Sequence, residues 1–515
     1  CDDGNTVDCD GCRGDCSAVE TGCGDGFVCG VEECDDATAN SDVMPDACRT
    51  TCVAAGCGDT VIDTGEECDD PDLGGQTCAL LGHDGGPLAC NGICSYDETA
   101  CIDCAPGLTF CDGGCVDTKA DDLHCGGCNN PCGADICVGG LCESVAQPWS
   151  MVGTNPVSDV RNALAHDLGT NGKTPTVVWL AEMGGGNRAV TVSEYTSGPA
   201  WDTLNPSPSG IGWFNETVSI TFDATTAWVA WSSGGAGAIH VAYRNGAGWT
   251  EVGAPGFPSA CGSHWNIDLV LDASARPHLT SFGAGGCAVS IDYGWWDGLL
   301  WQSHPSATGF PAGITSEGRG NPAIVYTDQA YIAVPDTNID GTSIHSVKYW
   351  DSNAGAWVDL GSLLDMNPAS DWMEPTALVA DATGNFYVAW AESDGGAPAT
   401  YDIYVKYYSF GSGTWTLLGP AEVNGAGSAT SPSLALIGGV PWVAYMETNG
   451  GVDEVVVRRY DVVNDTWIQV GPALNVNPAA NGVAPVIIGI DGIPTVSFRE
   501  ETGPGTYALY VFTFP

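Results

Sequence analysis

Tryptophan recurs at a nearly constant spacing of about 50 residues from position 149 to position 467. The seven occurrences stand in similar short phrases: PWSMVG, AWDTLN, GWTEVG, LWQSH, AWVDLG, TWTLLG and TWIQVG. Regular repetition at this period is typical of an array of similar structural units. This feature therefore restricts the last 370 residues or so to a repeat architecture.

Each period contains four short runs that favour β-strands. Residues 431–471 read SPSLALIGG, VPWVAYME, EVVVRRYDV and TWIQVG, with Gly, Asn and Asp between the runs. The runs are rich in β-branched and aromatic residues, and no stretch shows a sustained helical period. Four antiparallel strands per unit predict the blade of a β-propeller.

The number of blades follows from counting these runs. Six sets of three runs each precede a tryptophan phrase, and a seventh set ends the chain without one. The phrase at Trp149 has no set before it. The two incomplete pieces complement each other, so residues 146–515 are predicted to form a seven-bladed β-propeller. Strand 148–153 would complete the last blade and close the ring, which leaves no exposed edge between first and last blades.

The segment before several tryptophans repeats a small hairpin: SFGSGTW, DSNAGAW and YRNGAGW. It resembles a degenerate Asp-box hairpin of sialidase-like propellers, in which the hairpin is structural. A full sialidase resemblance would imply an arginine triad, a Tyr nucleophile with a Glu partner, and an Asp acid/base. Residues 146–515 contain eight arginines, and Arg458 and Arg459 are adjacent in a third strand, so no triad can be assigned. The resemblance is to the fold and the hairpin.

The first part of the chain has a different composition. Of the 25 cysteines, 23 lie before residue 143. This part has few long apolar runs, so cross-links are needed to stabilise it. Cysteine pairs such as Cys9/Cys12 and Cys125/Cys128 also have the spacing of zinc ligands, but other spacings are irregular and His does not alternate with Cys. Disulfides formed in an oxidising compartment are the favoured interpretation, with structural zinc as the alternative.

Two stretches of this first part align with each other: CGDGFVCGVEECDD from Cys23 and CGDTVIDTGEECDD from Cys57. They resemble the myxobacterial cysteine-rich repeats of bacterial surface proteins, over residues 1–103. Cys9 replaces a Gly of that pattern and Cys29 is an added Cys, which suggests a Cys9–Cys29 bridge between neighbouring units. Residues 104–145 resemble a second module, the stigma-specific-protein-like cysteine-rich domain. Both resemblances imply an extracellular structural region without catalysis.

The chain opens in the middle of one such unit, at CDDGNTVDCDGC. Truncation or processing would explain the odd cysteine total. The alternative is that Cys1 is the lipidated N-terminal residue of a bacterial lipoprotein.

Acidic pairs in the repeats could bind Ca²⁺, because hard oxygen ligands on a tightly turning backbone suit this ion. The spacing does not match an EF-hand loop, and a solvated acidic surface is the alternative. The candidate ligands are Asp2, Asp3, Asn5, Asp8, Asp10, Asp35, Asp36, Asp69, Asp70 and Asp72.

Chemistry within the predicted propeller is sparse. The second strand ends in an acid in several blades, which would place carboxylates near one mouth of the central channel, as a hydrated rim or around a cation. These acids are Glu182, Asp336, Glu392, Glu447 and Glu500. Paired carboxylates could also cleave a glycosidic bond if they lay about 5–10 Å apart. No other catalytic motif was identified.

Five further positions stand out. Cys261 and Cys287 flank two strands of the third blade and are predicted to form a disulfide. Trp295, Trp296 and Trp372 fall outside the repeat rhythm. They could stack on sugar rings or a protein partner, or pack beneath long loops.

The net charge limits the classes of partner that this chain is expected to bind. The formal charge of −50 disfavours nucleic acid and anionic membrane surfaces. No apolar run has the length of a membrane span. We therefore expect a secreted or cell-surface, non-enzymatic structural or adhesive protein, which binds other protein subunits or surface glycans and assembles as a homo-oligomer or filament. A polysaccharide-active enzyme (hydrolase or lyase) and a carbohydrate-binding lectin are the alternatives.

Overall fold

A computed structural model describes residues 9, 22–133, 135–154, 156–158, 162–184, 187–198, 200–204, 217–232, 238–246, 248–253, 257, 263–284, 290–304, 322–337, 343–367, 373–394 and 400–514. The chain divides into two compact units, Cys1–Val116 and Asp117–Pro515. The second unit begins inside the predicted 104–145 module. Among the described residues, no helix is long and apolar enough to cross a membrane.

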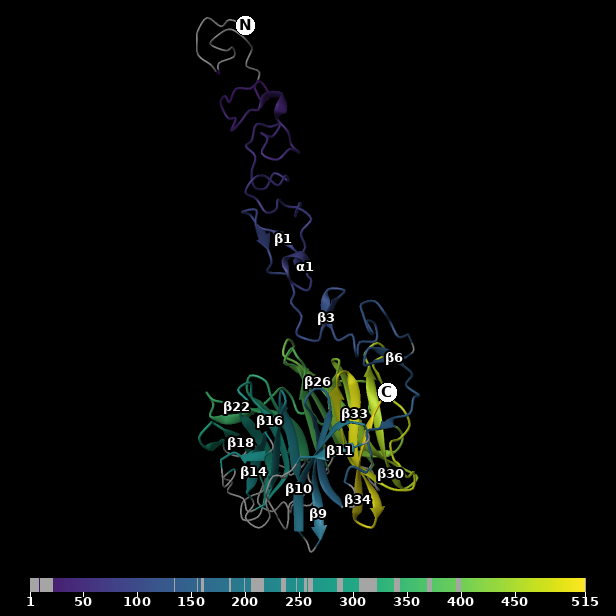
Figure 1. Cartoon of the computed structure of the whole chain (residues 1–515). Helices are drawn as coiled ribbons and strands as arrows, with labels where there is room; N and C mark the ends of the chain where they lie inside the picture. The colour runs from purple at the N-terminus through teal and green to yellow at the C-terminus, as the bar shows by residue number, and fades with distance from the viewer. Residues whose placement is uncertain are drawn as a thin grey trace, which may run out of the picture. The chain divides into compact units, whose positions relative to one another are not determined.

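The described part of the first unit consists mainly of loops (Figure 1). Its regular elements are η1 (Ala37–Ala39), α1 (Cys78–Leu81), β1 (Ala89–Cys90), β2 (Tyr96–Asp97), β3 (Thr109–Cys111) and β4 (Gly114–Val116). Its bridges include Cys9–Cys29, Cys23–Cys52, Cys34–Cys48, Cys57–Cys94, Cys68–Cys90, Cys78–Cys101 and Cys104–Cys115. The prediction of a disulfide-rich N-terminal region is confirmed.

A buried arginine joins two consecutive repeats of this unit. Arg49 is 4% exposed, and its guanidinium lies 2.7 Å from a carboxylate oxygen of both Asp59 and Asp63 in the next repeat. It also donates to the backbone carbonyls of Met44 at 2.9 Å and Ala47 at 3.1 Å. Each nitrogen of the guanidinium therefore has an acceptor, and the acceptors come from both repeats, which ties the relative position of the repeats to this charge.

A histidine that links two loops of the same unit gives a pH prediction. The imidazole nitrogens of His83 lie 2.9 Å from Glu98 Oε2 and 2.9 Å from Asp103 Oδ1. Hydrogen bonds to Glu98 and then Asp103 raise the pKa of His83 above its ordinary value. This contact should stabilise the unit fully below the unfolded-state pKa and be lost as pH rises through the folded-state pKa. An NMR titration of His83 should give a midpoint above about 6.5, and Glu98→Gln should lower that midpoint.

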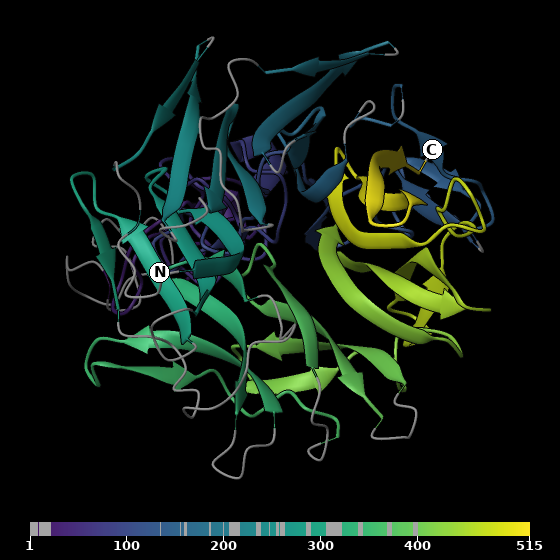
Figure 2. The same cartoon turned by 90° about the horizontal axis from the view of Figure 1, so that it is seen from below.

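The second unit contains seven four-stranded antiparallel sheets arranged in a ring (Figure 2). Blade 1 has β8 (Ala163–Thr170), β9 (Pro175–Gly184), β10 (Asn187–Ser197) and β11 (Ala200–Thr203). Blade 2 has β12 (Val218–Asp223), β13 (Thr226–Ser232), β14 (Ile239–Asn245) and β15 (Gly248–Glu251). Blade 3 has β16 (Ser263–Leu271), β17 (Pro277–Ala284), β18 (Ser290–Trp296) and β19 (Trp301–Ser303). Blade 4 has β20 (Ala323–Tyr326), β21 (Ala330–Thr337), β22 (Ser343–Asp351) and β23 (Ala356–Asp359).

The remaining blades follow the same order. Blade 5 has β24 (Met373–Ala380), β25 (Phe386–Ser393), β26 (Tyr401–Ser409) and β27 (Thr414–Leu417). Blade 6 has β28 (Ser428–Ile437), β29 (Val440–Asn449), β30 (Val452–Asp461) and β31 (Thr466–Gln469). Blade 7 has β32 (Gly482–Ile490), β33 (Ile493–Gly503), β34 (Thr506–Thr513) and β7 (Ser150–Met151). The prediction of a seven-bladed propeller is confirmed.

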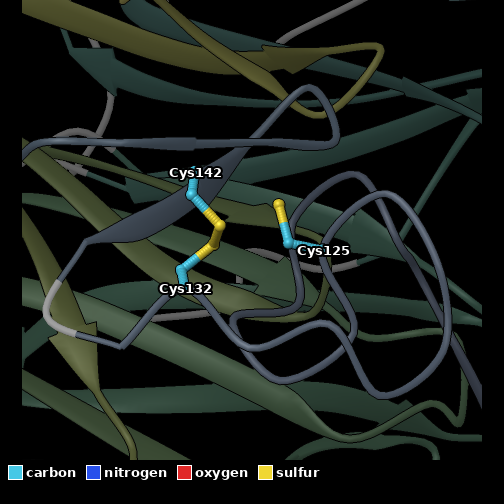
Figure 3. Close-up of side chains that lie close together, drawn as sticks. All are labelled: Cys125, Cys132 and Cys142. Carbon is cyan, nitrogen blue, oxygen red and sulfur yellow. A yellow bond between two sulfur atoms is a disulfide. The ribbon is translucent and has the colours of Figure 1, made fainter.

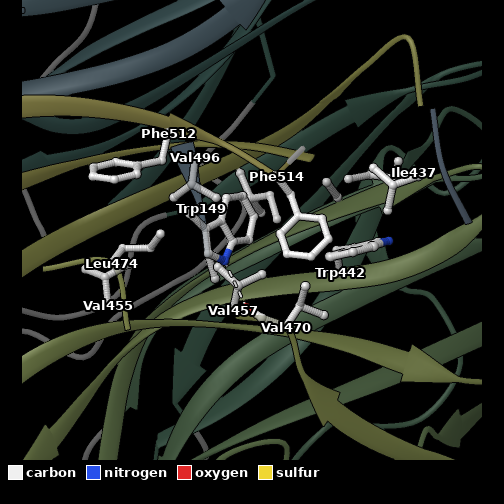
Figure 4. Close-up of a cluster of buried hydrophobic side chains, with 14 of the residues drawn as sticks. Trp149, Ile437, Trp442, Val455, Val457, Val470, Leu474, Val496, Phe512 and Phe514 are labelled. Carbon is white, nitrogen blue, oxygen red and sulfur yellow. Dashed lines mark hydrogen bonds between the residues drawn. The ribbon is translucent and has the colours of Figure 1, made fainter. Parts of the chain in front are cut away.

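The last blade is closed by the first strand of the propeller. β7 pairs antiparallel with β34, with Met151 opposite Phe512. Trp149 lies in the apolar core of this blade, where its ring meets Phe514 edge to face at a centroid distance of 5.3 Å (Figure 4). Figure 2 shows the yellow C-terminal strands beside the blue strands of the first blade. The closure therefore joins the two ends of the propeller sequence.

The repeated tryptophans connect successive blades around the ring. In six blades the indole N–H donates to a backbone carbonyl of the preceding blade. The acceptor residue stands three positions after the repeated tryptophan of that preceding blade. The donor–acceptor pairs are Trp149–Val470, Trp201–Val152, Trp249–Leu204, Trp301–Val252, Trp415–Leu360 and Trp467–Leu418, at 2.7 to 3.5 Å. The phrase W-x-x-[V/L] is therefore the sequence signature of a contact between blades.

In several blades a glycine follows this phrase and packs against the tryptophan of the next blade. Gly471 has φ +70°, and a Cβ there would lie 2.6 Å from the indole of Trp149. Gly253 has φ +66°, and a Cβ there would lie 2.6 Å from the indole nitrogen of Trp301. At these two positions a side chain would push the next tryptophan away, so the packing there needs glycine.

Residues 117–143 pack on blades 6 and 7 within the second unit. They include β5 (Ile136–Val138) and β6 (Leu141–Glu143). Ala120, Ile136 and Val138 share an apolar core with blade residues such as Trp442. Arg459 Nη2 lies 2.6 Å from Asp122 Oδ2, and Lys119 pairs with Asp491. This cysteine-rich segment therefore covers the two blades that meet the closing strand.

Candidate ligand-binding site

The acids at the ends of the second strands bind loops of their own blades. In blade 5, Glu392 accepts from the backbone N–H groups of Met366 at 2.9 Å and Asn367 at 2.5 Å. In blade 7, Glu500 accepts in the same way from Val476 at 2.6 Å and Asn477 at 3.1 Å. Both carboxylates are buried, and burial raises the pKa of Glu500. These hydrogen bonds hold in place the segment that leads into the first strand of each blade.

The other acids of this set are placed less uniformly. Glu447 in blade 6 accepts from Gly425 at 3.0 Å and Gly427 at 3.2 Å, whereas Glu182 is exposed and contacts the amide of Asn162 at 3.0 Å. The side chain of Asp336 lies outside the described residues. None of these acids belongs to a group of converging metal-ligand atoms among the residues described. A cation at the channel mouth stays a prediction.

The first acid of each repeat signature caps a turn. Asp35 accepts from the backbone N–H groups of Gly24, Asp25 and Gly26 at 2.8 to 3.1 Å, and Asp69 accepts from Gly58, Asp59 and Thr60 at 2.7 to 3.2 Å. Desolvation alone would raise the pKa of Asp35, but the hydrogen bonds from Ala37, Gly24, Gly26 and Asp25 outweigh it and lower the pKa. These two carboxylates organise the CGD turn of their own repeat.

The remaining candidate Ca²⁺ ligands are divided between local turns and undescribed positions. Asp36 accepts from Cys48 N at 2.8 Å, Asp72 accepts from Gly74 N at 2.9 Å, and Asp70 is exposed. Asp2, Asp3, Asn5, Asp8 and Asp10 lie outside the described residues. The Ca²⁺ hypothesis stays a prediction.

Close sulfur atoms in the described residues do not form a metal site. Cys125, Cys132 and Cys142 have sulfur atoms within 4.8 Å of one another (Figure 3). Cys132 is bonded to Cys142, and Cys125 to Cys137. A metal requires the thiolate, which a disulfide does not offer. Cys9 and Cys29 are likewise joined to each other. Cys261 and Cys287 lie outside the described residues.

Blade 3 departs from the other six blades at two equivalent positions. One is the third position after the repeated tryptophan, which is Val or Leu elsewhere and His304 here. The other lies in the third strand of each blade. It stands three positions before the residue that pairs across the sheet with the repeated tryptophan. It is Tyr293 in blade 3, and in the other blades it is Val192, Val241, Val347, Val405, Val457 and Val511.

These two exceptional rings face one pocket between blades 3 and 4. Tyr293 and His304 lie nearly parallel, with centroids 5.8 Å apart, and His304 stacks on Trp350 at 4.0 Å with an interplanar angle of 7°. Trp295 lies 4.7 Å from His304. The pocket has a volume of about 270 Å³, and its lining is Arg276, His278, Tyr293, Trp295, His304, Tyr326, Gln329, Ala330, Trp350, Ser352 and Trp357.

Polar groups are held among the aromatic rings. His278 Nδ1 lies 2.7 Å from the hydroxyl of Tyr293, and both side chains are buried. Burial lowers the pKa of His278 to about 4, so the ring is neutral at pH 7. Arg276 is exposed, and its Nε lies 2.7 Å from a carboxylate oxygen of Asp272. The pocket therefore combines flat apolar surfaces with fixed hydrogen-bonding groups.

The junction of blades 1 and 2 has a smaller hollow at the equivalent place. Its volume is about 160 Å³, and Glu194, Leu204 and Arg244 occupy the positions of Trp295, His304 and Trp350. The fold thus provides a depression between blades, and the blade 3 and blade 4 side chains make it aromatic.

The three tryptophans singled out from the sequence have separate positions. Trp295 lines the pocket. Trp296 instead packs on Trp301 at 5.8 Å, in the contact between blades. Trp372 lies outside the described residues. Sequence reasoning missed Arg276, Tyr293 and His304, although the departure of LWQSH from the other phrases signalled His304.

Comparison with known protein families and with curated proteins gives no match. Among solved structures, a protein of unknown function from Dyadobacter fermentans is similar at 9% identity and TM-score 0.40, over 72% of this chain and 98% of that chain. The polysaccharide lyase Uly1 is similar at 12% identity and TM-score 0.43, over 68% and 89%. The sialidase of Trypanosoma rangeli is similar at 11% identity and TM-score 0.36, over 69% and 55%. Similarities this low do not assign a function to this chain.

Proposed function

We propose that this chain is an extracellular, non-catalytic adhesive protein whose propeller binds carbohydrate in the pocket between blades 3 and 4. The observation that carries the proposal is the paired replacement at Tyr293 and His304. Two positions that are aliphatic in six blades become polar rings, and both face the same pocket. Departures from a local rule that coincide in space are typical of functional sites.

The chemistry of the lining favours a sugar ring. Pyranosides present flat C–H faces and polar edges, which match the aromatic surfaces of Trp295 and Trp350 and the polar groups of Arg276 and Gln329. The volume of about 270 Å³ is near the lower end of small-molecule pockets, about 300 Å³, which suits one sugar residue.

A binding role is favoured over catalysis. Glycoside hydrolysis generally uses two carboxyl groups about 5–10 Å apart. Within the described part of the chain, no Asp or Glu lines the pocket, and the nearby Asp272 is 7% exposed and held by Arg276. Glu392 and Glu500 are committed to backbone N–H groups.

The location and assembly are also part of the proposal. Many disulfides support an oxidising, extracellular setting. Surface glycans are then the natural partners of the pocket, and the disulfide-rich repeats would present the propeller to them. Assembly into a filament through other subunits stays a prediction. Electron microscopy of native material that shows only single particles would contradict it.

Removing Trp295 should abolish most of the binding. We expect Trp295→Ala to weaken binding of a glycan identified on an array by at least about tenfold, because removing a central aromatic anchor typically costs about 2 kcal/mol or more. Isothermal titration calorimetry would measure it. Tyr407→Ala is the matched control, because Tyr407 occupies the same strand position in blade 5.

A second variant tests the paired replacement at Tyr293 and His304, on which the proposal rests. Tyr293→Val combined with His304→Leu restores the residues that pack in the other blades, so the propeller should stay folded and lose glycan binding. Unchanged glycan binding in this variant would show that the pocket is not the binding site. Turnover of a polysaccharide that is lost in Glu182→Gln, Glu392→Gln, Glu447→Gln or Glu500→Gln would favour the enzyme instead.

A further inference from the structure

The charged side chains around the pocket have a net charge of zero or less. Arg276 is the cationic side chain of the described lining. Its Nε lies 2.7 Å from Asp272 Oδ2, whose side chain is 3% exposed. Asp272 Oδ1 also accepts from the backbone N–H groups of Ser274 at 2.8 Å and Arg276 at 2.9 Å. The guanidinium is therefore already paired with a buried and fixed carboxylate.

The other titratable groups that face the pocket add no positive charge at neutral pH. Burial lowers the pKa of His278 to about 4, and burial also lowers the pKa of His304. Burial raises the pKa of Tyr293 and of Tyr326, so both phenols are neutral.

Two further carboxylates lie on the neighbouring hairpins. Asp328 belongs to the hairpin between β20 and β21, and Asp297 to the hairpin between β18 and β19. Both are exposed. Hydrogen bonds from Leu300 and Leu299 chiefly lower the pKa of Asp297, and the charge of Arg276 contributes. Arg276 is thus accompanied by the paired carboxylate of Asp272 and by two exposed carboxylates on neighbouring hairpins, in a chain with a formal charge of −50.

We infer that the pocket selects an uncharged pyranoside over an acidic one, and that Asp272 sets this selectivity by neutralising Arg276. This inference rests on the proposed function. The carboxylate of a uronic acid would compete with Asp272 for the guanidinium and would meet the negative field of the protein. The affinity for a neutral sugar is lowered neither by competition with Asp272 nor by the negative field. It can accept hydrogen bonds from the free N–H groups of Arg276 and stack on the rings.

Asp272→Asn isolates this charge. The Asn side-chain oxygen can still accept from Ser274 N and Arg276 N, so the hairpin should hold, while Arg276 becomes free to bind a carboxylate in bidentate fashion. Asp381→Asn is the matched control: Asp381 Oδ1 accepts from Thr383 N and Asn385 N, each at 2.9 Å, in the equivalent hairpin of blade 5.

The experiment measures the affinity of the full chain for matched pairs of methyl glycosides: glucoside and glucuronide, galactoside and galacturonide. We expect the wild type and Asp381→Asn to favour the neutral member of the pair that binds. Asp272→Asn should shift the uronide-to-neutral affinity ratio by at least about tenfold toward the uronide, as a charge-assisted contact is gained. This shift should shrink between about 0.05 and 0.5 M NaCl.

The outcomes separate the two proposals. If the wild type binds a uronide as tightly as its neutral partner, or if folded Asp272→Asn leaves the ratio unchanged, the inference on selectivity is wrong and the binding site stands. If no glycoside and no array glycan binds, the proposed function itself fails. Should Asp272→Asn not fold, Arg276→Gln replaces it. This variant should weaken residual uronide binding more than neutral binding, and the reverse order would overturn the inference.

Discussion

Replacing Trp149 with alanine is expected to lower the free energy of unfolding of the propeller by about 3 to 5 kcal/mol, the usual cost of removing a buried large aromatic side chain. Trp149 is 8% exposed and packs in the core of blade 7. Its indole N–H donates to Val470 O at 2.9 Å, and Gly471 lies directly against its ring. The loss would fall at the junction where the first strand completes the last blade.

The measurement combines thermal unfolding with hydrogen exchange of β34. The amides of Val152 and Val157 donate to carbonyls of β34, at Val511 and Leu509. We expect exchange in β34 to increase more than exchange in β25, because blade 5 lies away from the closure. Trp149→Phe is the control: it keeps an aromatic ring, loses the indole hydrogen bond, and should cost about 1 kcal/mol beyond its smaller volume. If Trp149→Ala left both the Tm and β34 protection unchanged, β7 would not be closing the ring.

The second large effect is expected at the junction of two disulfide-rich repeats. Arg49→Met should destabilise this junction by about 3 kcal/mol, because it leaves the buried carboxylate of Asp63 and the partly buried carboxylate of Asp59 without their cation. Asp59 and Asp63 have side chains 17% and 6% exposed. The carbonyls of Met44 and Ala47 would lose their donor as well.

Hydrogen exchange over residues 41–64 reports on this junction in the intact chain. The disulfides within each repeat should persist, so the predicted change is local opening between Cys52 and Cys57, which no described bridge spans. Arg49→Lys is the control. A lysine keeps the charge but not the planar fork that reaches two carboxylates, so it should give an intermediate effect. Equal exchange in Arg49→Met and wild type would show that the ion pairs do not position the repeats.

Local sequence pattern was enough to predict the blades. β-strand formation depends on short-range alternation and on turn residues, both visible within each period of about 50 residues. The repeated tryptophan phrase was visible too, but its role was not. The indole of Trp301, for example, donates to Val252 in the preceding blade, so the phrase describes a contact between units.

The candidate acids recur along the sequence, but their contacts depend on the fold. Glu392, Glu447 and Glu500 lie near the ends of second strands, and each binds the backbone of the segment that leads into its own blade. Asp35 and Asp69 do recur in the repeats, and they cap turns. A sequence shows that a carboxylate is present, but the partner that occupies it is fixed by the folded backbone.

The sequence by itself determined the propeller, its seven blades and the oxidised cysteine-rich region, because strand periodicity, turn composition and cysteine density act over short distances along the chain. The tertiary structure alone decided that Arg276, His278, Trp295 and His304 of blade 3 and Tyr326 and Trp350 of blade 4 share one pocket. These side chains converge only because neighbouring sheets twist and pack side by side, which brings together residues more than 70 positions apart.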